Sequence, residues 1–227
     1  MVQIPISIRR SEPNGKVFDK KREILDAASR VFRRRGLHAT GMRDIAAELG
    51  MAVGNLYYYF KDKGELLAFV QESALTGLLE LSARVRDLPL RADGKLFFLI
   101  EEHIVLLNER TPGSLAHLEV EALGERFREA VQVRRDAYER SYREILEAGM
   151  AAGVFRKTDP KVSALAILGA ANWTVKWFRP DGSKTAREIG RECAEMLVRG
   201  LLAEGVELRA TPPSPGDESP GYKGSAG

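Results

Sequence analysis

Small and polar residues that could meet the edges of DNA bases stand together at Ala52, Val53, Gly54 and Asn55. A helix that enters the major groove buries one face on its neighbours and presents such groups at its N-terminal end. Gly54 costs roughly 1 kcal/mol relative to alanine inside a helix, and two explanations stay open: a close approach of the backbone to DNA, or simple tolerance. We interpret the stretch as a candidate base-reading segment.

The first quarter of the chain is basic. Between Met1 and Lys63 there are 13 Lys and Arg against 7 Asp and Glu, a net charge of +6, whereas the rest of the chain has 22 against 25. A basic segment attached to a near-neutral body favours a polyanionic partner, because bound cations release counterions from phosphates. A solvated basic face explains the charge equally well. The charge therefore supports the DNA interpretation without deciding it.

Three short helices are expected to position these residues. Apolar side chains recur at three- and four-residue steps between residues 19 and 35, which predicts a first helix that Gly36 ends. Thr40 is a suitable N-cap for a second helix over residues 41–49, and Gly50 fits its C-terminal turn. The base-reading segment opens a third helix at once. Two short helices joined by a tight glycine turn form a helix-turn-helix.

The rest of the chain reads as helices with breaks at proline and glycine positions, and no segment alternates as a strand would. The predicted helices run from Glu65 to Arg86, Asp93 to Arg110, Ser114 to Leu123, Glu125 to Ala152, Pro160 to Phe178 and Thr185 to Glu204. The fold class is therefore all-α. The expected divisions are a disordered arm (1–18), a three-helix helix-turn-helix domain (19–64), a second helical domain (65–208) and a disordered tail (209–227).

The segment from Ile45 to Lys63 closely resembles the DNA-binding domain of the TetR family. The likeness covers about Lys20 to Leu67 in the right order: the first helix, the second helix, the glycine turn and a Leu-Tyr-x-x-Phe-x-x-Lys pattern. It implies a homodimeric repressor that binds palindromic operator DNA, with a C-terminal ligand-binding and dimerisation domain through which a small molecule releases it. A dimer also follows from DNA geometry, because two recognition helices must lie about 34–36 Å apart to read a palindrome.

The resemblance adds further DNA contacts. It implies that Tyr57 and Tyr58 contact phosphate or thymine methyls, that Tyr59 stands where the family often has histidine, and that Lys63 pairs with a phosphate. Tyr57 could equally be a core aromatic whose hydroxyl alone reaches the surface. The start of the second helix offers free amides to an anion. The expected DNA-binding residues are Thr40, Arg43, Ala52, Val53, Gly54, Asn55, Tyr57, Tyr58, Tyr59 and Lys63.

Trp173 and Trp177 share a helix face in the second domain. They are either core and interface packing, as aromatic stripes usually are, or part of a ligand site. Together with Asn172 and a Pro-Asp-Gly turn, they resemble TetR-type regulators of lipid or aromatic-acid catabolism, several of which respond to acyl-CoA. Such a ligand needs an apolar tunnel and cations at its mouth. The expected ligand-binding residues are Leu99, Leu106, Val131, Arg134, Arg135, Asn172, Trp173, Lys176, Trp177 and Arg179.

The last two predicted helices resemble the pair that builds the family's dimeric four-helix bundle. Small residues near Gly169 permit close packing, and an apolar face continues along the last helix. The expected dimer-interface residues are Gly169, Ala170, Ile189, Met196, Leu197 and Leu201.

Other classes of protein have little support in the sequence. There is no P-loop, dinucleotide fingerprint or His-Glu-x-x-His, and His38, His103 and His117 are scattered, so we expect no enzyme, cofactor or metal site. Cys193 is expected to be a small buried hydrophobe. No apolar run approaches the ~18 residues of a membrane span, and the N-terminus lacks the features of a secretory signal. The expected location is the cytoplasm, without a membrane partner.

Two alternatives stay open at this point. One is a TetR-type regulator of efflux or stress genes that responds to a hydrophobic compound other than a CoA thioester. The other is a DNA-binding module without a ligand, acting as an architectural or partner-dependent factor.

Overall fold

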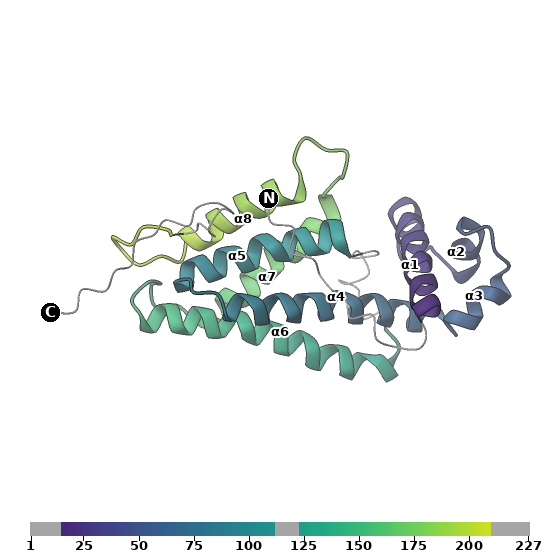
Figure 1. Cartoon of the computed structure of the whole chain (residues 1–227), viewed down its shortest axis with the longest axis horizontal. Helices are drawn as coiled ribbons and strands as arrows, with labels where there is room; N and C mark the ends of the chain where they lie inside the picture. Colours follow the sequence, from purple (N-terminus) through teal and green to yellow (C-terminus); the bar gives the residue numbers. More distant parts are fainter. Residues whose placement is uncertain (1–14, 112–122, 210–227) are drawn as a thin grey trace.

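The structure is a computed structural model and describes residues 15–111 and 123–209. Those two ranges are predominantly helical (Figure 1). The elements are α1 (Gly15–Arg35), α2 (Met42–Glu48), α3 (Val53–Tyr59), α4 (Lys63–Arg86), α5 (Ala92–Val105), the π-helix η1 (Leu106–Arg110), α6 (Glu125–Ala151), α7 (Pro160–Trp177) and α8 (Ala186–Arg199). Within this part of the chain the only β-type pairing is an isolated bridge between Phe155 and Leu202. The all-α prediction is confirmed.

Two groups of helices lie along the long axis of the molecule (Figure 1). Helices α1, α2 and α3 form the smaller group at one end, here called the head. In the larger group, here called the body, α5 and α6 pack against α4, α7 packs against α5 and α6, and α8 packs mainly against α5. Apolar residues at the start of α4, such as Leu66 and Val70, belong to the core of the head. Residues further along it, such as Leu78 and Leu81, belong to the core of the body. One continuous helix therefore joins the two cores.

Glycines in the left-handed region end the first two helices of the head. Gly36 has a φ of 82° and Gly50 a φ of 62°. Residues with a Cβ rarely adopt this backbone conformation. Helix α2 begins after Gly41, whose N–H donates to the Asp44 carboxylate at 2.8 Å. The prediction that Thr40 caps this helix is wrong, because its hydroxyl donates instead to the Gly36 carbonyl at 2.8 Å, beyond the end of α1.

Two helix boundaries differ from the sequence prediction because of contacts between distant segments. Helix α1 begins at Gly15 rather than at residue 19, and the Phe18 ring packs edge-on against Phe69 of α4, with ring centroids 6.2 Å apart. Helix α8 ends at Arg199 rather than at residue 204. The chain after it turns to pair with the segment that follows α6, where the Arg156 N–H donates to the Leu201 carbonyl at 2.9 Å.

Three predictions from the sequence fall outside the described residues. These are the arm up to residue 14, most of the predicted helix from Ser114 to Leu123 together with His117, and the tail from residue 210. The boundaries of the two predicted domains stay predictions.

Helix α4 is long and apolar enough to cross a membrane, judged by length and composition alone. The sequence prediction concerned an unbroken apolar run, and in α4 Glu72 and Glu80 interrupt such a run. Half of its most apolar stretch is buried inside the protein, which is equally typical of the central helix of a packed bundle.

Candidate DNA-binding surface and effector cavity

Helix α3 presents one face to solvent and buries the other. Leu56 and the following Phe60 are completely buried in the core of the head, whereas Tyr58 is 75% exposed and Tyr57 is 47% exposed. The Tyr58 and Tyr59 rings meet edge-on with centroids 5.0 Å apart. At the N-terminal end of the helix, Ala52, Gly54 and Asn55 are exposed and Val53 is partly exposed. The outward groups of α3 are thus those that the sequence predicted.

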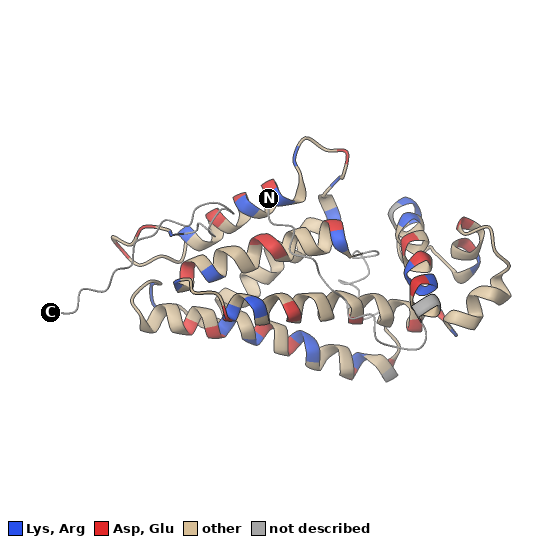
Figure 2. Ribbon diagram, viewed as in Figure 1, with Lys and Arg blue, Asp and Glu red and all other residues tan. Residues whose placement is uncertain are grey.

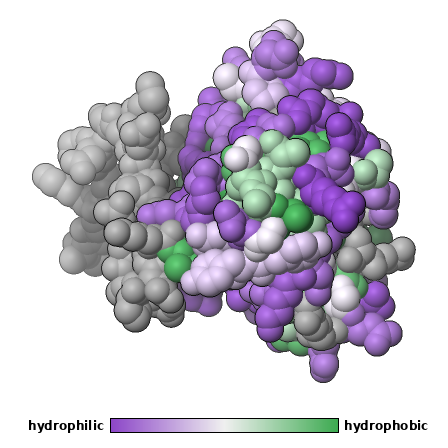
Figure 3. All heavy atoms as spheres, turned by 90° about the vertical axis from the view of Figure 1, so that its right-hand side faces the viewer, coloured by the Kyte–Doolittle hydropathy of each residue, from purple (hydrophilic) through white to green (hydrophobic). Residues whose placement is uncertain are grey.

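The exposed face of α3 lies at the free end of the head. Figure 3 looks onto this end of the molecule and shows a largely hydrophilic surface around a small apolar group. Helix α3 carries no charged residue, while charges of both signs line α1 behind it (Figure 2). In protein–DNA complexes, contacts to bases read the sequence and contacts to phosphates position the protein. An uncharged α3 flanked by cations elsewhere on the head suits this separation of roles.

Ion pairs hold α2 against α1. Glu48 accepts from Arg30 at 2.8 Å and also from Arg34, and Arg35 pairs with Asp44 at 2.5 Å. Arg34 and then Arg30 lower the pKa of the Glu48 carboxyl to about 2, chiefly through these hydrogen bonds. Three of the basic residues that made the first quarter of the chain cationic are therefore engaged within the head.

Two predicted phosphate contacts are oriented inward. Thr40 is 2% exposed and bonds to the backbone, and the Lys63 ammonium donates to the Leu37 carbonyl at 2.5 Å. Partial burial lowers the pKa of Lys63. Arg43, in contrast, is exposed on α2. Of the side chains predicted to bind DNA, those of Arg43, Asn55, Tyr57 and Tyr58 are presented most openly.

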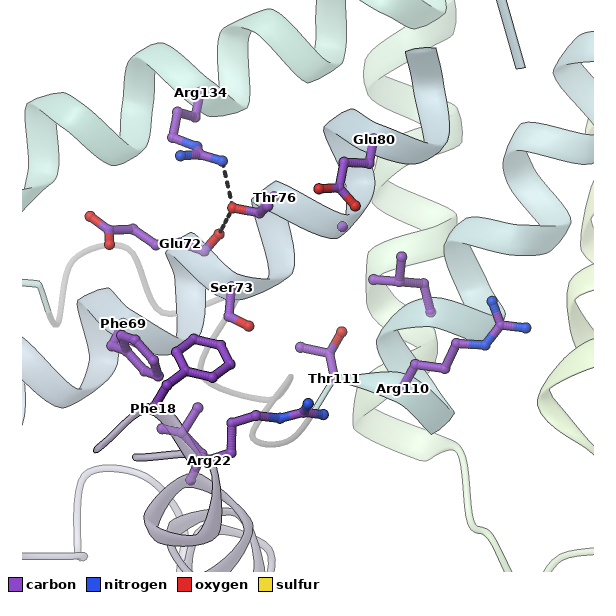
Figure 4. A pocket seen from close by; sticks show the side chains of 13 residues that line it. Phe18, Arg22, Phe69, Glu72, Ser73, Thr76, Glu80, Arg110, Thr111 and Arg134 are labelled. Carbon is purple, nitrogen blue, oxygen red and sulfur yellow. Dashed lines mark hydrogen bonds between the residues drawn. The ribbon is translucent and has the colours of Figure 1, made fainter. Parts of the chain in front are cut away.

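A cavity of about 250 Å³, here called the junction cavity, lies where the head meets the body (Figure 4). Phe18, Arg22 and Leu25 of α1 form one wall. Residues of α4, η1 and α6 form the others, and there the Arg134 guanidinium donates to the Thr76 hydroxyl at 2.7 Å. The full lining is Phe18, Arg22, Leu25, Phe69, Glu72, Ser73, Thr76, Gly77, Glu80, Leu106, Arg110, Thr111 and Arg134. Apolar rings, three arginines and two glutamates, Glu72 and Glu80, therefore line one small space between the two parts of the molecule.

A chain of ion pairs leads from the junction cavity to α8. Arg110 donates to Glu102 at 3.2 Å, and Arg187 of α8 donates to Glu102 at 2.6 Å and to Glu101 at 2.9 Å. Glu101 is 1% exposed. Gly190 permits the close approach of α8, since a Cβ there would lie 2.8 Å from the Glu101 carbonyl oxygen. The cavity wall and the last helix thus share a pair of buried carboxylates.

Comparisons with known proteins identify the family. Residues 24–70 match the family model of bacterial regulatory proteins of the tetR family, and residues 90–201 match that of the tetracyclin repressor-like C-terminal domain. The crystal structure of PfmR from Thermus thermophilus, a TetR-family regulator, is 31% identical, covers 78% of this chain and 97% of its own, and superposes with a TM-score of 0.71. The chain belongs to the TetR family.

Two further relatives are similar over most of their length. The transcriptional repressor KstR2 of Mycobacterium tuberculosis is 29% identical over 85% of this chain and 98% of its own. The crystal structure of AibR, in complex with isovaleryl coenzyme A and operator DNA, is 27% identical, with a TM-score of 0.69 and coverage of 81% and 98%. This chain is therefore a TetR-type transcriptional regulator, and the expectation that it is not an enzyme agrees with its relatives.

The ligand-binding residues predicted for this TetR-family chain do not form one group. Leu106 and Arg134 line the junction cavity, whereas Leu99 and Val131 are fully buried in the separate cores of body and head. Arg135 is partly exposed on α6. The remaining predicted residues lie on α7 or just after it: Asn172 faces inward, and Trp173, Lys176, Trp177 and Arg179 are exposed.

Sequence reasoning missed a buried polar cluster in the body of this TetR-family regulator. The His103 Nδ1 lies 2.9 Å from the Tyr138 hydroxyl and 3.3 Å from the Tyr142 hydroxyl, and its Nε2 lies 3.1 Å from the Asn172 Oδ1. Burial lowers the pKa of His103 to about 4, so the ring is neutral at pH 7. The described residues contain no group of three or more potential metal ligands, and His103 has phenol and amide partners instead.

Helices α7 and α8 carry an exposed apolar surface. Trp173 is 61% exposed, Leu165 52%, Val162 64% and Met196 of α8 67%. Gly169 and Ala170 are exposed among them. Of the other predicted interface residues, Ile189 and Leu197 are partly buried against the core of the body, and Leu201 is a core residue with 8% exposure. Leu201 does not face outward because the chain after α8 turns back toward Phe155.

Proposed function

We propose that this regulator is a homodimeric repressor that reads palindromic operator DNA through α3 and leaves it when a small effector binds. The observation that carries the proposal is the form of α3, which buries Leu56 under an exposed row of Gly54, Asn55, Tyr57 and Tyr58. A helix with that division of faces is the kind that a helix-turn-helix inserts into the major groove. Tyrosine hydroxyls and an asparagine amide supply hydrogen bonds to phosphates and base edges.

The exposed surface of α7 and α8 supports dimerisation. Large apolar side chains such as Trp173 and Leu165 lie beside Gly169 and Ala170, which lets two helices approach closely. Two-fold pairing through this surface would set two heads at a fixed distance, as a palindrome requires. We assign Trp173 and Trp177 to the dimer surface, because both are exposed and neither lines the junction cavity.

The junction cavity is proposed to receive the acyl end of an acyl-CoA effector. Its volume of about 250 Å³ is smaller than the roughly 300–1,000 Å³ of sites that enclose a whole small molecule, so the nucleotide part would lie outside. Apolar Phe18, Phe69 and Leu106 suit the acyl chain, and Arg22 and Arg110 suit anionic groups at the mouth. The structure of the relative AibR with isovaleryl coenzyme A supports this class of effector.

An effector in this cavity would affect both DNA binding and dimer geometry. One wall belongs to α1, so filling the cavity would move α1 relative to α4. An anionic group that drew Arg110 away from Glu102 would also alter the buried ion pairs with Arg187 of α8. Release requires that the effector bind the released state more tightly, by about 1–3 kcal/mol in a typical coupling.

The test is binding of a fluorescent operator fragment, taken from the DNA upstream of the protein's own gene, measured by anisotropy with and without a panel of acyl-CoAs. Release by an acyl-CoA, but not by free CoA or the free acid, is the expected result. Release only by hydrophobic compounds that are not CoA thioesters would favour the alternative regulator of efflux or stress genes. The variant Arg22→Gln, which changes a lining residue outside the ion pairs that lead to α8, should bind operator normally and need more effector for release, whereas Lys184→Gln on the surface should behave as wild type.

The recognition surface has its own test. We predict that Tyr58→Ala weakens operator binding by about tenfold or more, because a hydrogen bond to a charged phosphate contributes roughly 1.5–3 kcal/mol. Tyr58 is 75% exposed, so folding and dimerisation should be unchanged by size-exclusion chromatography and denaturation. Tyr58→Phe separates the hydroxyl from the ring. Unchanged affinity of Tyr58→Ala would remove this residue from the DNA-binding surface.

A further inference from the structure

A second and larger cavity lies in the body, away from the junction cavity. It has a volume of about 680 Å³ and lies between the end of α4, the start of α5 and the second half of α6. Apolar side chains of all these segments line it, among them Leu79, Leu90 and Ile145. It shares no lining residue with the junction cavity. The volume lies within the range of sites that hold a small molecule.

The charges around this body cavity are mostly positive. Arg86, Arg91, Lys95 and Arg140 line it, against a single acidic residue, Glu144. Such an excess of cations beside an apolar lining is complementary to a molecule with an apolar chain and an anionic head.

The four cations differ in how many hydrogen bonds and ion pairs they already form with the protein. Arg91 is held by Asp93 in two hydrogen bonds of 2.7 and 2.8 Å, and the Lys95 ammonium donates to the Arg86 carbonyl at 2.6 Å. The Arg86 side chain is 71% exposed, and its one side-chain partner among residues 15–111 and 123–209 is Asp87, at a long 3.4 Å. These contacts fix Arg91 and Lys95 to the protein and leave the Arg86 guanidinium largely unused.

Arg140 is the cation best placed to bind a ligand. It lies on α6 among the lining residues, is exposed, and has no ion pair or hydrogen bond with another residue in the described part of the chain. The next arginine of the helix, Arg143, is paired instead with Glu139 at 3.0 Å. An unengaged guanidinium at the edge of an apolar cavity has five N–H donors available for a planar anion.

We propose that the body cavity is a second ligand site and that it binds a medium- or long-chain carboxylate. The chain lies along the apolar lining, and the carboxylate accepts hydrogen bonds from Arg140 and Arg86. Because the lining comes from α4, α5 and α6, a bound carboxylate crosslinks the three helices at the end of the body that is remote from the head. This site is independent of the operator and of the effector proposed for the junction cavity.

The experiment is isothermal titration calorimetry of the full chain with decanoate, 1-decanol and decyl phosphate, each below its aggregation concentration. Wild-type protein should bind decanoate, and decanol should bind at least about tenfold more weakly, since it lacks the charge-assisted hydrogen bonds. Arg140→Gln should weaken decanoate binding by about tenfold. Arg143→Gln, on the same helix but outside the cavity, and Arg134→Gln, in the junction cavity, should bind as wild type. Decyl phosphate binding more tightly than decanoate would overturn the choice of headgroup.

A second variant tests the cavity without touching a charge. Ala148 is an exposed lining residue of α6, so Ala148→Trp should fold normally and fill the space that the chain would occupy. It should abolish decanoate binding while leaving the far-ultraviolet circular dichroism unchanged. Failure of wild-type protein to bind decanoate, or equal binding of decanol, would overturn the proposal. Loss of binding in Arg134→Gln with full binding in Arg140→Gln would place the carboxylate in the junction cavity instead.

Discussion

The head and the body are both built from amphipathic helices, but their interiors differ in chemistry. Among the described residues up to Asp62, Thr40 is the one polar side chain that is buried. The interior of the body contains several polar and charged side chains: Asp93, Glu101, Glu102, His103, Asn108 and Thr174. The interior of the head is therefore stabilised by apolar packing, with its ion pairs at the surface, whereas the interior of the body also depends on hydrogen bonds and ion pairs between particular partners.

This difference matches what each part is proposed to do. A head that presents α3 to DNA needs one fixed shape, which apolar packing at high density provides. Buried charges are costly unless paired, and Glu102 accepts from both Arg110 and Arg187, so one of these partners can leave without stranding the carboxylate. We interpret the polar interior of the body as the part whose arrangement an effector can change.

The largest effect expected from this comparison is loss of apolar packing in the head. Phe60→Ala should lower the free energy of unfolding by about 3–5 kcal/mol, because Phe60 is completely buried between α3 and α4. Urea denaturation monitored by circular dichroism gives the value, with the exposed Tyr58→Ala as the control expected to stay within about 0.5 kcal/mol. A loss below about 1 kcal/mol for Phe60→Ala would mean that packing does not dominate the head.

The next effect concerns the neutral histidine of the body. Burial lowers the pKa of His103 to about 4 in the folded protein, against about 6.5 in an unfolded chain. As the pH falls, the unfolded state therefore takes up the proton first. The stability that depends on neutral His103 is complete above about pH 6.5 and is lost as the pH falls toward 4, by about 3 kcal/mol in all.

The measurement is the free energy of unfolding between pH 7 and pH 4 for wild type and for His103→Gln. Between pH 7 and pH 4 the free energy of unfolding of wild type should fall by about 3 kcal/mol more than that of His103→Gln. This difference does not depend on how stable the variant is at pH 7. Parallel curves for wild type and His103→Gln would show that His103 is not held neutral in the body.

A smaller effect is expected from the ion pairs between α5 and α8. Arg187→Gln leaves Glu101 and Glu102 with weaker partners in a buried setting and should cost about 2 kcal/mol, reduced from a fully buried pair because Arg187 is itself 45% exposed. Lys184→Gln removes an exposed pair with Glu192 and should cost less than about 0.5 kcal/mol. Equal losses in the two variants would remove the distinction between the buried and the surface pairs of the body.

The two parts also differ in how far the sequence predicts them. The three helices of the head follow from local signals: the apolar stripe before Gly36, the turn at Gly50 and the Leu56 and Phe60 face. The polar cluster of the body joins His103 to Asn172, which is 69 residues away in the sequence. Periodicity cannot reveal such a pair, because a lone polar residue on an apolar helix face gives no indication of its partner.

The candidate sites show the same division. The outward groups of α3 could be predicted because they lie within two turns of one helix, where the helical period decides which residues share a face. Of the predicted ligand residues, only Leu106 and Arg134 line the junction cavity, and Arg22 and Arg110 were missed because α1 and η1 meet there only in the folded chain. The exposure of Trp173 and Trp177 could not be read from their spacing, since either face of α7 could have turned inward.

The smallest effect should come from the surface charges of the head. Arg35 pairs with Asp44 across α1 and α2, but the two side chains are 60% and 30% exposed, so Arg35→Gln should cost about 0.2–1 kcal/mol and nothing measurable in 1 M salt. Asp44→Asn should cost more, because the same carboxylate also accepts the Gly41 N–H at the start of α2. Both values come from denaturation at low and high salt. If Arg35→Gln lowered the free energy of unfolding as much as Phe60→Ala, the head could not be stabilised mainly by its apolar interior. Its surface ion pairs would then contribute as much to stability as the buried ion pairs of the body.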